Sequence, residues 1–245
     1  MHPAIFLVLL ALLAPPAAAD ETLTIAVASN FSRTAAELSR HFSDTTGIRV
    51  RISNGSTGHL YAQIINGAPY DVFLAADAER PALLVESGHA VAGSRFTYAT
   101  GGLSLWSRDA KDCLATLEDA SAGRVALANP ATAPYGRAAM EFLRQGGYWA
   151  SVAERAVYGE NIMQTLQFAA TGNAAIAIVA RSMLTDSRLP AAACTWPVPE
   201  TTHARIEQQA VLLVASNTAA VRFVEFLRGA AAREIVTRHG YGVMP

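Results

Sequence analysis

The sequence predicts an α/β protein of two lobes, each built on an open, mainly parallel sheet flanked by helices, with a ligand cleft between the lobes. Apolar, strand-like runs alternate with segments of helical spacing, an order typical of parallel sheets covered by helices. The alternation runs through residues 20–100 and starts again within residues 101–206, and residues 207–245 are expected to return to the first lobe. Each lobe would have about 100 residues, a usual size for a domain.

In the first lobe, residues 23–28 are apolar on both faces and rich in β-branched side chains, as in a buried parallel strand. A helix with Leu38 and Phe42 on one face comes next, and then an alternating strand, a second helix and a third strand. These four elements are predicted at residues 34–42, 48–52, 60–65 and 72–76.

The second lobe repeats this pattern. Strands are predicted at residues 103–106, 124–128, 156–158 and 174–180, with helices at 137–143 and 165–169. The proline-rich residues 194–199 are expected to form a loop or an edge, and the chain should end with a strand at 209–214 and helices at 221–227 and 231–239. We expect the hinge crossings between the lobes near residues 99–102 and 204–209.

Residues 1–19 have the pattern of a secretory signal peptide, with a short apolar run, prolines and a small-residue site before Asp20. The run is shorter than the roughly 20 apolar residues that span a bilayer. We therefore expect an exported, soluble mature protein. The formal charge of −1, with 16% charged residues, argues against nucleic acid or a membrane surface as a partner.

Two cysteines, Cys113 and Cys194, lie far apart in the second lobe. An oxidising compartment would allow them to form a disulfide, and the alternative is two separate buried thiols. Neither cysteine has a second ligand at close spacing, so we expect no metal site at either.

Four clusters of small polar residues stand where a strand ends and a helix should begin. They are Ala28-Ser29-Asn30, Asn54-Gly55-Ser56-Thr57-Gly58, Ala133-Pro134-Tyr135-Gly136 and Gly159-Glu160-Asn161-Ile162, and none contains lysine or arginine. Any one of them could simply be a helix N-cap or a tight turn. Together, at the carboxyl ends of parallel strands, they favour an anion site made of helix starts and neutral donors.

Neutral donors select the kind of anion. A cluster without acceptors would leave the O–H of hydrogen phosphate unpaired, at a cost of about 1–3 kcal/mol. A fully ionised dianion has no such hydrogen, so sulfate and molybdate fit this pattern and phosphate fits poorly. The spacing of the clusters does not separate sulfate from the larger molybdate or tungstate.

Along essentially the whole mature sequence, the chain resembles the periplasmic molybdate-binding receptors of bacterial ABC importers. The most specific stretch is Gln63-Ile64-Ile65-Asn66-Gly67-Ala68-Pro69-Tyr70-Asp71-Val72-Phe73. The likeness extends through the four clusters, Ala75-Ala76-Asp77, Gly93-Ser94-Arg95-Phe96-Thr97-Tyr98-Ala99 and Asn129-Pro130.

The resemblance implies a type II periplasmic-binding-protein fold and a monomeric receptor, not an enzyme, that delivers molybdate or tungstate to the permease and ATPase of an importer. It implies no cofactor, and molybdenum enters only as the molybdate ligand. The implied oxyanion-binding residues are Ser29, Asn30, Thr57, Tyr135 and Ile162, the last two through backbone N–H groups, with Ser56 and Asn161 as secondary candidates. A branch of the family has a further tyrosine where this chain has Ala180.

Other hypotheses remain. A sulfate or thiosulfate receptor is the alternative of the same class, and an exported hydrolase with Ser29 or Ser56 as nucleophile is the alternative of another class, although no base is placed for it. Asp71 and Asp77 could form a carboxylate pair, but they would repel an anion and are expected to cap turns or brace the cleft floor. His59 stands near a cluster and is expected to be solvated.

Overall fold

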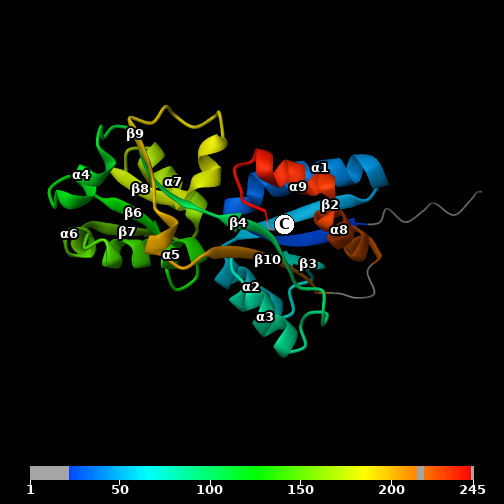
Figure 1. Cartoon of the computed structure of the whole chain (residues 1–245). Coiled ribbons are helices and arrows are strands. Elements are labelled where there is room, and N and C mark those ends of the chain that lie inside the picture. The colour runs from blue at the N-terminus through cyan, green and yellow to red at the C-terminus, as the bar shows by residue number, and fades with distance from the viewer. Residues whose placement is uncertain (1–21, 214–217, 244–245) are drawn as a thin grey trace, which may run out of the picture.

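Two five-stranded mixed sheets form the framework of the computed structural model, which describes residues 22–213 and 218–243. The strand order is β2-β1-β3-β10-β4 in the first sheet and β7-β6-β8-β5-β9 in the second. Figure 1 shows the sheets as the centres of two lobes that lie side by side. The predicted two-lobe α/β fold is confirmed. The lobe limits named above stay predictions, and the predicted signal peptide lies outside the described residues.

The first lobe is layered, with helices on both faces of its sheet. Its strands are β1 (Thr22–Ala28), β2 (Arg49–Gly55), β3 (Val72–Leu74), β4 (Phe96–Gly101) and β10 (Ile206–Leu212). Helices α1 (Ser32–Thr46), α8 (Thr218–Arg228) and α9 (Ala230–Arg238) cover one face, and α2 (Thr57–Ile65) and α3 (Glu79–Glu86) cover the other (Figure 1). Leu23, Ile25 and Val27 of β1 therefore pack with α1, α8 and α9, while Ala26 packs with α2 and α3.

The second lobe has the same construction. Its strands are β5 (Leu103–Ser107), β6 (Val125–Ala128), β7 (Ala156–Gly159), β8 (Ile176–Ala180) and β9 (Cys194–Pro197). Its helices are α4 (Cys113–Glu118), α5 (Pro134–Gln145), α6 (Trp149–Val152) and α7 (Ile162–Ala170). Residues of α4, α5 and α6 share one core, and Leu166 of α7 belongs to the core on the other face. The proline-rich segment is the edge strand β9.

Each sheet is half parallel, which makes it mixed where the sequence predicted a mainly parallel sheet. β1 pairs with β2 and β3 in parallel, and β6 does so with β7 and β8. β10 runs antiparallel to β3 and β4, and β5 runs antiparallel to β8 and β9. The reason is the path of the chain, because β5 and β10 both enter their sheets from the side that faces the other lobe.

The chain crosses between the lobes twice. Gly102 alone separates β4 from β5, which agrees with the predicted crossing near residues 99–102. The return lies between β9 and β10, at residues 198–205, and so falls mostly before the predicted 204–209 because β10 already begins at Ile206. Within the second lobe, a disulfide joins Cys113 at the start of α4 to Cys194 at the start of β9.

Among the helices that the structure describes, none has both the length and the apolar character needed to cross a membrane.

Candidate functional site

The four polar helix starts meet in one small cavity between the lobes. The pairing of β1 with β2 places Ala28 beside Gly55, and the pairing of β6 with β7 places Ala128 beside Gly159, so the helix starts that follow are neighbours in each lobe. The cavity has a volume of about 10 Å³ and is lined by Ala28, Ser29, Asn30, Ser56, Thr57, Ala76, Ala133, Pro134, Tyr135 and Ile162. That is about the space of one water-sized sphere, so the cavity must widen to hold a four-oxygen anion.

At the start of α2, one backbone N–H, that of Thr57, is left unpaired at the cavity. The N–H of Gly58 donates to the carbonyl of Thr132 at 2.8 Å, and the N–H of His59 donates to the Ser56 hydroxyl at 3.4 Å. Thr57 is the first residue of the helix, so its N–H has no carbonyl behind it to pair with. Within residues 22–213 and 218–243 this N–H has no hydrogen-bond partner.

In the second lobe, α5 and α7 each likewise begin with one backbone N–H that is left unpaired. In α5, Pro134 has no N–H and the N–H of Gly136 donates to a carbonyl at 2.9 Å, which leaves the N–H of Tyr135. In α7, the Asn161 side chain accepts from the second and third N–H groups of the helix at 3.0 and 3.1 Å. The N–H of Ile162 is left, and neither remaining N–H has a partner in the part of the chain that the structure describes.

Asn161, a secondary candidate, is thus the cap of α7 and does not line the cavity. Capping still contributes to the site. The Asn161 side chain pairs with the N–H groups of Met163 and Gln164, and the N–H of Ile162, at the cavity wall, stays unpaired.

Three hydroxyl groups complete the donor set. The Thr57 hydroxyl accepts the N–H of Ala76 at 3.1 Å and the Ser56 hydroxyl accepts an N–H, so each keeps its own hydrogen to donate. The hydroxyl of Ser29 makes no hydrogen bond to any described residue, and the Ser29 side chain is buried. Together with the three N–H groups, these hydroxyls give six neutral donors around one cavity.

Asn30 lines the cavity but directs its amide elsewhere. Its Nδ2 group donates to Gln208 Oε1 at 2.7 Å and to the Tyr241 hydroxyl at 3.2 Å, so both amide hydrogens have partners. Within the described residues, the backbone N–H is the one donor of Asn30 that is left for the cavity, and it would add a seventh donor to the six above. Sequence reasoning missed Gln208, which stands near the start of β10 between two other polar residues, Glu207 and Gln209, and belongs to no motif.

Charged groups are kept behind the cavity wall. No lysine or arginine is among the ten lining residues. Burial raises the pKa of Asp77, which is held by an ion pair with Arg80 and by the Arg80 N–H. Asp71 accepts the backbone N–H of Thr24 at 2.7 Å, and His59 is exposed. Both carboxylates therefore brace the first lobe and do not face the cavity.

Contacts between the lobes surround the cavity and hold it closed. Besides the hydrogen bond from Gly58 to Thr132, Arg80 donates to the Ala131 carbonyl at 3.3 Å. An exposed ion pair joins Arg137 of α5 to Glu79 of α3 at 2.8 Å. On the other side, Arg33 of α1 donates to the Thr185 hydroxyl at 3.2 Å.

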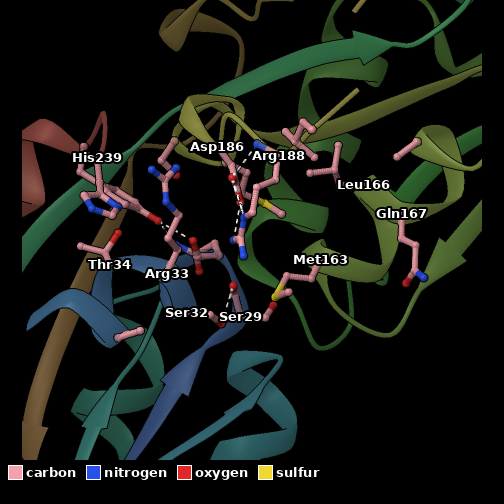
Figure 2. Close-up of a pocket in the computed structure, with 17 residues that line it drawn as sticks. Ser29, Ser32, Arg33, Thr34, Met163, Leu166, Gln167, Asp186, Arg188 and His239 are labelled. Carbon is pink, nitrogen blue, oxygen red and sulfur yellow. Dashed lines mark hydrogen bonds and ion pairs between the residues drawn. The ribbon is translucent and has the colours of Figure 1, made fainter. Parts of the chain in front are cut away.

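A larger groove of about 540 Å³ adjoins the cavity and shares Ser29 and Asn30 with it. Figure 2 shows Ser32 and Arg33 of α1 on one side of this groove and Met163 of α7 on the other. Arg188 pairs with Asp186 at 2.7 Å, and this hydrogen bonding lowers the pKa of Asp186 to about 2. An ionised carboxylate and an arginine that is already paired make the groove a poorer place for an anion than the cavity.

Among the described residues, no histidine ring is hydrogen-bonded to Ser29 or Ser56, the two nucleophiles of the hydrolase alternative.

Two hinged α/β lobes that close around a cavity of converging helix starts define the class of solute-binding proteins. The chain belongs to the bacterial extracellular solute-binding protein family, whose model matches residues 23–242.

Relatives within this class are molybdate-binding proteins. The chain is 42% identical to the molybdate-binding protein ModA of Rhodobacter capsulatus, over 94% of this chain and 91% of that protein. It is 41% identical to the ModA protein of Azotobacter vinelandii, over 95% and 94% of the two chains. Its structure is similar to that of an Azotobacter vinelandii periplasmic molybdate-binding protein, with a TM-score of 0.85 and 36% identity, covering 91% of this chain and 99% of that one. The resemblance that the sequence motifs predicted is confirmed.

Proposed function

We propose that this protein binds the molybdate dianion, and tungstate, between its two lobes in the periplasm and delivers it to the permease and ATPase of an ABC importer. The observation that carries the proposal is the convergence of six neutral donors on one cavity without a lysine or arginine. The relatives named above support molybdate as the ligand and a periplasmic receptor as the setting.

The donor set favours a dianion with four bare oxygens. Each hydrogen bond to a charged oxygen is worth about 1.5–3 kcal/mol, so six of them can hold a dianion without a counter-charge. Three helix starts add their positive dipole ends. The hydroxyls of Ser56 and Thr57 already accept a backbone N–H each. The site therefore offers few acceptors for the O–H of hydrogen phosphate, which should be bound less well than a dianion.

Calorimetric titration of the mature protein with molybdate, tungstate, sulfate and phosphate tests the proposal. We expect molybdate and tungstate to bind at least about 100-fold more tightly than sulfate, a difference of about 2.7 kcal/mol, and phosphate to bind most weakly. Sulfate binding as tight as molybdate binding would show that the ligand assignment is wrong.

Ser29→Ala should weaken molybdate binding by about tenfold, because it removes one hydroxyl donor to a charged oxygen, worth about 1.5 kcal/mol. The variant should unfold at the wild-type temperature, since the hydroxyl has no partner in the described protein. Ser87→Ala, at the exposed end of α3, is the matched control and should leave the affinity unchanged. Equal affinities for wild type and Ser29→Ala would remove Ser29 from the site.

A further inference from the structure

Gln208 is a fully buried amide on the strand that brings the chain back from the second lobe. It is the third residue of the crossing strand β10, beside an irregularity in the pairing of β10 with β4. Its side chain has 0% exposure although it is polar. A buried amide is costly unless its hydrogen bonds are made, so the partners of this one indicate what it does.

The partners of Gln208 are residues of the candidate anion site and its surroundings. Its Oε1 atom accepts from Asn30 Nδ2 at 2.7 Å and from the Tyr98 hydroxyl at 3.3 Å. Its Nε2 group donates to the Tyr135 hydroxyl at 3.3 Å. The Tyr98 hydroxyl shares its one hydrogen between this oxygen and the Ala75 carbonyl at 3.1 Å, so the Asn30 amide is the main donor to Oε1. One side chain thereby contacts Asn30 of the first lobe and Tyr135 of the second.

Tyr135 reaches into the hinge region to meet this amide. Its hydroxyl lies so close to Gly101 that a Cβ atom on residue 101 would be 2.0 Å from it. The hydroxyl of Tyr135 thus lies at the hinge, whereas the backbone N–H of Tyr135 lies at the cavity. Anchoring the phenol at the hinge therefore fixes where this N–H stands relative to the first lobe.

We propose that Gln208 is a positioning residue of the anion site, which ties the helix start at Asn30 to the helix start at Tyr135 in the closed protein. This inference rests on the proposed function. It also explains why an amide stands here: a carboxylate in its place would repel the bound dianion and would have no N–H to donate to the Tyr135 hydroxyl.

The groups around Gln208 are neutral. Burial raises the pKa of Tyr98 and Tyr135 well above the usual value and that of Tyr241 to about 12, so all three phenols keep their protons. The charged groups that act on these phenols are Asp77, which influences Tyr98, and Arg181, which influences Tyr135. A carboxyl group introduced at position 208 would be a new titrating group in this neutral cluster.

The test is the affinity of Gln208→Glu for molybdate at pH 5.5 and pH 8, measured by calorimetry beside the wild type and Gln209→Glu. At pH 8 we expect Gln208→Glu to bind about 30-fold more weakly than the wild type, about 2 kcal/mol, and to regain most of this loss at pH 5.5, where burial beside the dianion favours the protonated carboxyl. Gln209→Glu is matched, because residue 209 is on the same strand, is 9% exposed and faces Arg95 at 3.0 Å instead of the site.

A Gln208→Glu variant that binds like Gln209→Glu at both pH values overturns the inference. So does a loss of the same size at both, because a packing defect does not titrate. If Gln208→Glu does not fold, Gln208→Met decides: about tenfold weaker binding by the folded variant supports the inference whether or not its melting temperature falls, and wild-type affinity overturns it. Wild-type protein that does not bind molybdate would refute the proposed function itself, which is a separate result.

Discussion

Gly58→Ala should weaken molybdate binding by about 100-fold while leaving the ligand-free protein folded. In the closed structure, a Cβ atom on residue 58 would lie 2.9 Å from the Cα atom and 3.0 Å from the carbonyl oxygen of Thr132 in the other lobe. These are backbone atoms and cannot turn away, so the lobes would have to separate at the point where the Gly58 N–H now donates to Thr132 at 2.8 Å. Overpacking of this kind costs about 1–3 kcal/mol.

The cost falls on closure alone, because an open protein has no Thr132 against Gly58 and alanine is the better helix former. Calorimetry should therefore report the loss of affinity, while thermal unfolding without ligand stays at the wild-type temperature or rises. His59→Ala, one residue further along α2 and exposed, is the control and should bind normally. Unchanged affinity in Gly58→Ala would mean that the anion binds without this closed contact.

Thr57→Val should also weaken molybdate binding by about 100-fold. The substitution keeps the shape of the side chain but removes a hydroxyl whose hydrogen is free to bond a charged oxygen, worth about 1.5–3 kcal/mol. It further leaves the buried N–H of Ala76 without the acceptor that it has at 3.1 Å. We therefore expect both a lower affinity and a melting temperature lower by a few degrees.

Thr57→Ser separates the two effects of that substitution, since it keeps the hydroxyl and loses only a methyl group. We expect near-wild-type affinity for Thr57→Ser in the same calorimetric titration. If Thr57→Ser loses as much affinity as Thr57→Val, the methyl group and not the hydroxyl matters, and Thr57 is not an anion donor.

The sequence predicted those helices and strands that have a clear apolar run or helical spacing of their own. Residues 23–28 are apolar on both faces because β1 is buried between two helical layers. Helix α3, with a proline at Pro81, and the six-residue α4 were not predicted, because neither shows enough helical spacing to stand out. The mixed pairing of the sheets was also missed, since it depends on the two crossings between the lobes and not on any strand by itself.

The candidate site divides in the same way. Ser29, Thr57, Tyr135 and Ile162 stand at helix starts after strands, a local pattern, and all four line the cavity. Their roles as anion ligands stay predictions. The direction of the Asn30 amide depends on Gln208, which is 178 residues away along the chain, and the role of Gly58 depends on Thr132 of the other lobe. Contacts between residues so far apart in the chain produce no pattern in the sequence around either residue, so they could not be predicted from it.

A crystal structure of the protein grown with molybdate, with molybdenum located by its anomalous scattering, tests the central claim most directly. We expect one strong peak in the cavity between the lobes, within hydrogen-bonding reach of the Thr57 hydroxyl and of the N–H groups of Tyr135 and Ile162, through the oxygens of the anion. A peak beside Arg33 and Arg188 in the larger groove, with none in the cavity, would contradict the account.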